Sequence, residues 1–203
     1  MTRLSPRRLG QLLVGLFLYG FTMALMVRSG LGLDPWDVFH DGLARRTGLS
    51  FGQVVIVVGA LVLLLWIPLR QRPGIGTVLN VVVVGLAADL GLDWVAQPDG
   101  SWWRIALLVA GIVGNGFAGA LYIGAALGSG PRDGLWLGLV RRTGGSVRRW
   151  RTVVEVTVLS AGWLLGGSVG IGTVLYAMTI GPLVQAFVPM TRREVPEDVL
   201  SRR

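Results

Sequence analysis

Six long apolar stretches, separated by short segments rich in arginine, glycine and proline, dominate the hydrophobic pattern of this chain. A bilayer with a hydrocarbon core of about 30 Å needs roughly 20 apolar residues in each crossing helix. Each stretch approaches that length, so the pattern predicts six membrane-spanning helices. The predicted spans are at about 9–31, 51–69, 75–95, 103–127, 152–168 and 171–189.

The pattern also repeats, because residues from about 12 to 85 reappear without a gap 96 positions later. A unit of three spans crosses the membrane an odd number of times, so the second unit must enter from the opposite side. We therefore predict an all-α polytopic membrane protein of six transmembrane helices, built as two inverted three-helix repeats. The first repeat is expected at 1–98 and the second at 99–190, forming one membrane domain, with a cytoplasmic tail at 191–203.

Each repeat carries a segment between its first and second spans that is too short to cross the membrane, at 34–48 and at 130–144. Asp34 fits an N-cap, Pro35 the first helical position and Gly48 a C-terminal stop, which predicts a short half-helix. If these half-helices are re-entrant, their N-termini would suit an anionic or polar solute, and Asp37 and Asp133 would line the pathway. If they are interfacial, both aspartates merely complete helix caps.

Composition and charge place the chain in the membrane. Apolar residues make up 52% of it, and the mean hydropathy is +0.63. All 19 basic residues are arginines between the apolar stretches, and with a cytoplasmic N-terminus only four fall outside: Arg28, Arg45, Arg46 and Arg104. This positive-inside bias predicts cytoplasmic termini, and it explains the pI of about 11.4 without a nucleic-acid partner.

Polar residues inside the predicted spans are candidates for function, because burying ionisable groups in hydrocarbon costs free energy. Asp89 has no basic residue within a helical turn, so it is either a proton- or cation-linked group or a helix-to-helix hydrogen-bond partner. Glu155 is either part of the pathway or the partner of Arg151 in an i,i+4 salt bridge. The candidate solute or ion pathway comprises Asp37, Asp133, Asp89, Glu155, Asn80 and Asn115. Asp89→Asn is expected to impair solute-dependent activity without lowering the folded yield.

The sequence does not favour an enzyme. Cysteine is absent, and His40 is the single histidine, expected at a solvated or capping position. No metal pair, serine–histidine dyad or nucleophilic cysteine is available, so we expect no catalytic residue, no metal site and no cofactor.

Two duplicated motifs carry a family resemblance. They are Gly-x-x-Pro-x-Asp, at Gly32–Asp37 and Gly128–Asp133, and Gly-Ile-Gly-Thr, at Gly74–Thr77 and Gly170–Thr173. Together with the intervening Arg-Arg-Thr-Gly they resemble the YczE/YitT group of bacterial integral membrane proteins. The chain has no counterpart of the soluble C-terminal domain of the YitT branch, so it is nearer the small YczE-like members. The resemblance implies a multi-pass protein of the bacterial plasma (inner) membrane, and it supplies no binding residues.

Two functions remain open. The first is a small-solute transporter or permease with a site between inverted repeats. The second is a non-catalytic accessory or substrate-capture subunit that works through a partner protein. The expected partners are the lipid bilayer, a small-molecule solute, and a membrane-protein partner or a second copy of the chain.

Overall fold

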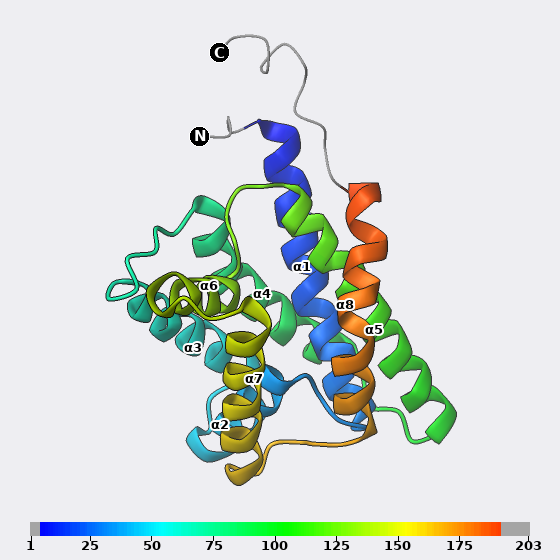
Figure 1. Ribbon diagram of the computed structural model, residues 1–203. Coiled ribbons are helices and arrows are strands. Elements are labelled where there is room, and N and C mark those ends of the chain that lie inside the picture. Colours follow the sequence, from blue (N-terminus) through cyan, green and yellow to red (C-terminus); the bar gives the residue numbers. More distant parts are fainter. Residues whose placement is uncertain (1–4, 192–203) are drawn as a thin grey trace.

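The computed structural model describes residues 5–191, which form eight α-helices and no strand (Figure 1). The predicted tail at 191–203 lies, apart from Thr191, outside the described residues. The helices are α1 (Pro6–Ser29), α2 (Pro35–Thr47), α3 (Phe51–Trp66), α4 (Ile75–Trp94), α5 (Ser101–Gly124), α6 (Pro131–Thr143), α7 (Val147–Leu164) and α8 (Ile171–Thr191).

Both short helices predicted from the sequence are confirmed, as α2 and α6. The Asp34 side chain accepts a hydrogen bond of 2.8 Å from the backbone N–H of Asp37, so Asp34 caps α2 as expected. The helices end at Gly48 and Gly144, whose φ angles of 72° and 73° are left-handed and favour glycine.

The helices of the structure give four or five candidate membrane spans, fewer than the six predicted. Four helices, α1, α4, α5 and α8, are long and apolar enough to cross a bilayer. The pair α2 and α3, bent by 113°, makes a fifth candidate as one broken span. The predicted fifth span, at 152–168, corresponds to α7, which has three arginines among its first five residues and is not among the helices apolar enough to qualify as a span.

The centre of the molecule is the antiparallel packing of α1 on α5, which are equivalent helices of the two repeats. A Cβ on Gly15 would lie 2.8 Å from the backbone nitrogen of Tyr122, and one on Gly111 would lie 2.6 Å from Met26. These glycines let the two helices approach closely near both ends of their contact. The end of α8 and the start of α1 lie at the same, upper end of the molecule in Figure 1.

The two halves make matched contacts with each other. The Gly76 N–H donates to the Leu127 carbonyl at 3.0 Å, and the Gly172 N–H donates to the Leu31 carbonyl at 2.8 Å. The donors are 96 positions apart, and so are the acceptors. The short helices follow the same symmetry, since each packs on a helix of the other half: α2 on α7, and α6 on α3. Each half therefore holds the short helix of the other.

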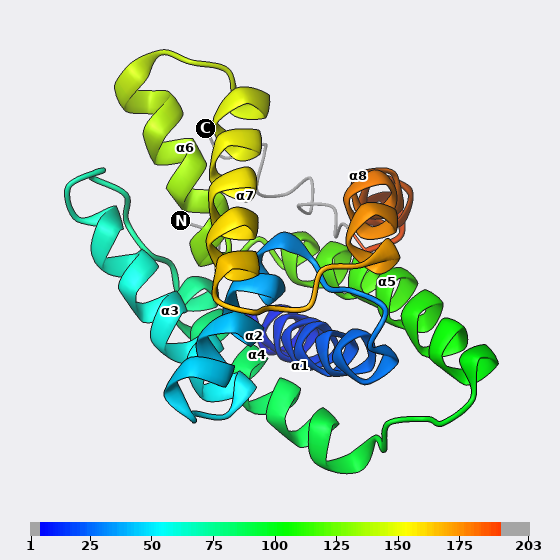
Figure 2. The same cartoon turned by 90° about the horizontal axis from the view of Figure 1, so that it is seen from below.

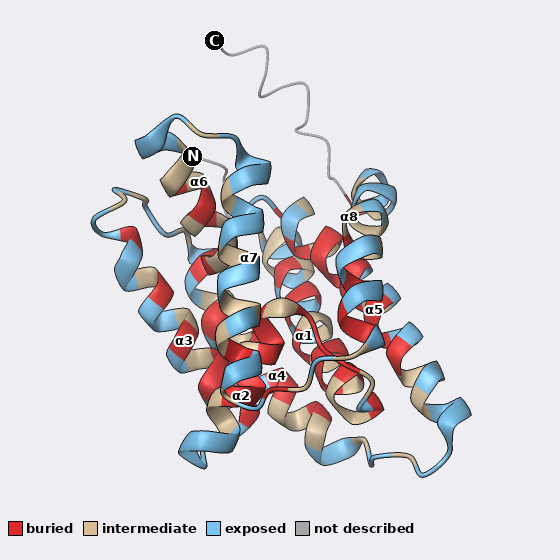
Figure 3. Ribbon diagram, turned by 60° about the horizontal axis from the view of Figure 1, so that its bottom comes forward, coloured by how far each residue is buried: buried red, intermediate tan, exposed pale blue. Residues whose placement is uncertain are grey.

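One contact breaks this correspondence. In the first half α3 packs along α4, whereas the equivalent helices α7 and α8 stand apart in both Figure 1 and Figure 2. Figure 3 shows buried residues concentrated on α1, α2, α4 and α5, while most of α7 is exposed. In α7 only Gly162 is buried. The second half is thus more open than the first.

Candidate functional site

A cavity of about 300 Å³ lies where the two halves meet. The N-termini of both short helices reach it, through Pro35 of α2 and Pro131 of α6. Aliphatic side chains of α3 and α4 form one wall, and residues of α1, α2, α5, α6, α7 and α8, among them most of the aromatic and charged ones, form the rest. The cavity therefore has an apolar side and a strongly polar side.

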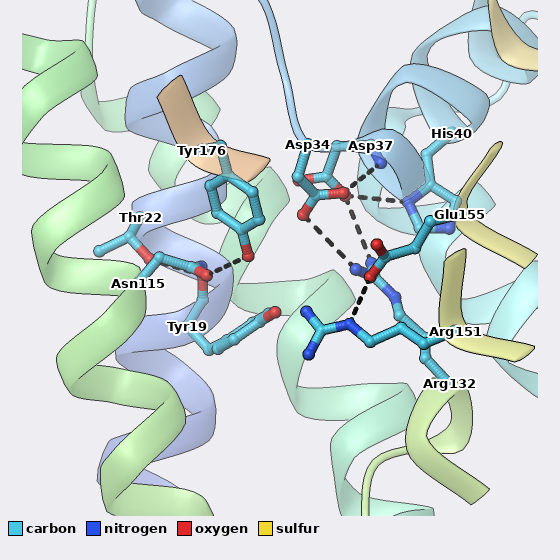
Figure 4. Close-up of polar contacts among 10 residues, drawn as sticks. All are labelled: Tyr19, Thr22, Asp34, Asp37, His40, Asn115, Arg132, Arg151, Glu155 and Tyr176. Carbon is cyan, nitrogen blue, oxygen red and sulfur yellow. Dashed lines mark hydrogen bonds and ion pairs between the residues drawn. The ribbon is translucent and has the colours of Figure 1, made fainter. Parts of the chain in front are cut away.

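The half-buried guanidinium of Arg132 is the main charge on the polar side (Figure 4). Its Nη1 lies 3.5 Å from Oδ2 of Asp34, and its Nη2 lies 3.4 Å from Oδ1 of Asp37. The guanidinium also lies 5.2 Å from the centre of the Trp36 ring. Arg132 lies in the first turn of α6, so a cation of the second half neutralises two carboxylates at the start of α2 in the first half.

Asp37 has a second partner in His40, whose Nδ1 lies 3.1 Å from Asp37 Oδ1. His40 is only 2% exposed, so the expectation of a solvated histidine is wrong. Phe51 and Trp36 are among the aromatic residues that flank its ring, and this packing removes it from water. The Oδ2 atom of Asp37 is buried without a hydrogen-bond partner among the described residues.

Two further ionisable groupings lie on the same side of the cavity. Asp133 Oδ2 accepts a hydrogen bond of 2.9 Å from the Tyr122 hydroxyl. Arg151 donates from Nε to Glu155 Oε1 at 2.8 Å, and its guanidinium lies 5.6 Å from the centre of the Trp136 ring. The i,i+4 salt bridge considered for Glu155 is present, and both of its members line the cavity.

The two candidate asparagines also line the cavity. Asn115 is fully buried, donates to the Tyr19 carbonyl at 3.3 Å and to Thr22 Oγ1 at 3.1 Å, and accepts from the Tyr176 hydroxyl at 2.9 Å. It thus ties α1, α5 and α8 together beside the cavity (Figure 4). Asn80 is half-buried on α4, at the position equivalent to Tyr176.

Asp89 lies elsewhere. Its carboxylate accepts hydrogen bonds from the Ser50 hydroxyl and, at 2.6 Å, from the Gly52 N–H. These donors belong to the start of α3, so Asp89 joins α4 to the N-terminus of α3. It is not among the residues that line the cavity.

The structure adds residues that sequence reasoning missed, chiefly Arg132, Arg151 and Asp34. A signal was present for Arg132, because it occupies the position equivalent to Trp36 inside an otherwise duplicated motif. Across the described residues, no three His, Asp or Glu side chains are grouped as ligands for a metal ion. The site is therefore best described as a paired-charge cavity with aromatic walls.

Comparisons with known proteins find relatives over almost the whole chain. Residues 6–189 match a family described as a family of unknown function, DUF6198. An uncharacterized protein of Haemophilus influenzae is 40% identical over 182 residues, covering 90% of this chain and 84% of the relative. The uncharacterized membrane protein YczE of Bacillus subtilis is 35% identical over 182 residues, covering 87% and 83%. The uncharacterized protein YyaS of the same organism is 26% identical over 184 residues, covering 89% and 92%. No solved structure matches.

Proposed function

The chain belongs to the DUF6198 family of membrane proteins related to YczE, and from its geometry we propose that it is a transporter whose solute site is the cavity between the two halves. Membership confirms the resemblance that the duplicated motifs indicate. The observation that carries the proposal is the cavity itself, where both short helices begin and where Arg132 joins the halves.

The cost of the buried charges supports a functional role. Ionisable groups at membrane depth are rare, and in transporters they usually mark the path of a solute or an ion. Here Arg132, Asp34 and Asp37 are clustered with at most 22% of any of these side chains exposed. Four cavity-lining aromatic residues, Trp36, Trp136, Tyr122 and Tyr176, are also buried. Such a mixture can bind a polar molecule and shield it from lipid.

The proposed membrane arrangement has six crossings, at α1, α3, α4, α5, α7 and α8, with α2 and α6 as half-helices that begin at the cavity and end at the membrane surface. Helices interrupted near a solute site are common where two inverted repeats meet. The matched hydrogen bonds of Gly76 and Gly172 support this symmetry, and so does the antiparallel packing of α1 on α5. The positive-inside bias favours an orientation in the bacterial inner membrane in which the start of α1 and the end of α8 face the cytoplasm.

The open second half and the closed first half support alternating access. The cavity is bounded by the separated helices α7 and α8, while α3 and α4 are closed by the bond from Asp89 to the start of α3. A transporter must expose its solute site first to one side of the membrane and then to the other. A protein with one open half and one closed half can do this by exchanging the conformations of the two halves.

Cysteine accessibility tests this proposal, because the chain has no native cysteine. Val58→Cys places one thiol on the cavity wall with little change in volume. We expect a membrane-impermeant thiol reagent to modify it in both right-side-out and inverted vesicles. Modification from one side only would overturn the transporter proposal and favour the accessory or capture subunit.

Matched controls come from two exposed positions at the starts of α3 and α7. Ser50→Cys and Ser146→Cys are equivalent in the repeat, and neither residue lines the cavity. Each should react from one side of the membrane only. If either control reacts from both sides, the vesicles are leaky and the Val58→Cys measurement must be repeated in sealed ones.

A further inference from the structure

Both α7 and α8 line the cavity without packing along each other, and the space between these two helices is called the opening below. The lining of the cavity includes Arg151 and Glu155 of α7 and Gly181 and Val184 of α8, yet α7 packs on α2 and α6 instead of along α8. The two helices stand apart from both viewing directions (Figures 1 and 2). Gly181 of α8 lines this space, and a Cβ added there would meet no atom within 4 Å, so a molecule in the cavity has room to extend toward the opening.

The sequence itself prevents this opening from closing as its counterpart does. In the first half, a Cβ on Gly85 would lie 2.5 Å from the Gly52 carbonyl oxygen, so α3 and α4 touch through glycines. The equivalent residues of the second half are Gly181 and Arg148, and a Cβ on Gly181 would meet no atom within 4 Å. A long arginine replaces the glycine that the close crossing requires.

The opening faces the hydrocarbon of the bilayer. The outer surfaces of α7 and α8 carry exposed apolar side chains, among them Val156, Leu164, Val174 and Met178. A cavity of about 300 Å³ is at the small end for an organic ligand, so it holds a head group better than a whole lipid. The chains of an amphiphile would then leave through the gap into the membrane.

The charges indicate which head group fits. Among the described contacts, Asp133 forms no salt bridge and accepts a hydrogen bond from the neutral Tyr122 hydroxyl, so its carboxylate can take a cation as a further partner beside the more distant Arg132 and Arg151. Arg151 uses its Nε in the salt bridge with Glu155, but it is 45% exposed and lines the cavity, so its terminal N–H groups can also meet an anion. A zwitterion that enters with its ammonium group first would bring this group to Asp133 and its acidic group to Arg151.

We propose that the cavity binds a zwitterionic amphiphile from the bilayer, with its ammonium group against Asp133, its acidic group against Arg151 and its chains between α7 and α8. This proposal rests on the transporter function above and names the class of its substrate. In phosphatidylethanolamine the ammonium group is at the tip and the phosphate is nearer the chains, so this lipid is a suitable probe.

Native mass spectrometry of the purified protein tests the inference. The protein is mixed with equal amounts of phosphatidylethanolamine and anionic phosphatidylglycerol, and the bound fraction of each is measured. We expect phosphatidylethanolamine to be retained about tenfold better, since one charge-assisted contact of about 1.4 kcal/mol corresponds to that ratio. Equal retention of the two lipids would overturn the proposal. So would a protein that binds neither lipid and forms a dimer, in which a second copy of the chain covers the opening.

Two variants locate the bound lipid. Gly181→Leu fills the gap and should abolish the preference, whereas Met178→Trp adds bulk to the exposed, lipid-facing surface of α8 and should leave it unchanged. Asp133→Asn should lose the preference for the ammonium lipid without loss of total lipid binding. A preference that survives both Gly181→Leu and Asp133→Asn would place the lipid on the outer surface and refute the inference.

The outcomes separate this inference from the transporter proposal. Two-sided reactivity of Val58→Cys without a lipid preference would leave a transporter for a water-soluble solute and reject the amphiphile. One-sided reactivity with the expected lipid preference would retain the amphiphile site and reject transport.

Discussion

At the residue scale, the stability of the cavity depends on one cation held by two carboxylates. Arg132 lies within 3.5 Å of Asp34 and within 3.4 Å of Asp37, and both carboxylates are almost completely buried. Breaking a buried pair by removing one partner leaves an uncompensated charge, which costs more than the intact pair contributes. The pairing therefore matters to folding as well as to any ligand.

Arg132→Gln should lower the free energy of unfolding by about 3–5 kcal/mol, because two buried carboxylates lose their counter-ion. The double variant Arg132→Gln/Asp37→Asn should recover a substantial part of this loss, since it also removes a carboxylate. Thermal unfolding in detergent measures both. Arg141→Gln, which loses only an exposed bond to Gln71, is the control and should behave as wild type. A double variant less stable than Arg132→Gln would show that the ion pair is not the cause.

Asp89 is expected to act on stability through the start of α3. Asp89→Asn keeps one acceptor oxygen but loses the charged bonds to Ser50 and Gly52, so we expect a loss of about 1.5–3 kcal/mol. Thermal unfolding against Asp93→Asn, an exposed neighbour on α4, provides the comparison. An unchanged melting temperature together with lost transport would instead return Asp89 to the solute or ion pathway.

At the scale of the elements, the sequence predicts individual helices better than their contacts. The boundaries of α2 follow from Asp34, Pro35 and Gly48, because capping is a local property of neighbouring residues. The close approach of α3 to α4 depends on glycines from two helices meeting across space, and no local pattern pairs Gly52 with Gly85. For the same reason the sequence did not predict the opening between α7 and α8.

Equivalent glycines of the two repeats should respond oppositely to the same substitution. Gly85→Ala forces a Cβ against the Gly52 carbonyl and Ile56, so α3 must move away from α4 and the protein should lose stability. Gly181→Ala meets no neighbour and should be neutral or stabilising by up to about 1 kcal/mol, as alanine is the better helix former. Thermal unfolding of the pair checks this, and equal effects at both sites would contradict the asymmetry of the halves.

At the scale of the whole molecule, the repeat predicts which segments correspond but not how the cavity is made. The 96-residue offset anticipates that Asp37 and Asp133 occupy equivalent places. The charged cluster arises where the repeats differ, because Arg132 replaces Trp36 and Asp34 has Gly130 as its counterpart. Each short helix packs on the other half, and this places Arg132 beside Asp34. The sequence of one half alone does not reveal this contact.

The orientation of the halves gives the last prediction. Ser50 and Ser146 are equivalent, exposed N-cap residues of α3 and α7, so a cysteine at either site loses a helix cap, and Ser50→Cys also loses the bond to Asp89. In intact cells an impermeant thiol reagent should label Ser50→Cys and spare Ser146→Cys, because inverted halves place these positions on opposite sides with cytoplasmic termini. Permeabilised cells should show labelling of both, which establishes that each variant is present and reactive. Labelling of both variants in intact cells would mean parallel halves, and the six-crossing arrangement would have to be abandoned.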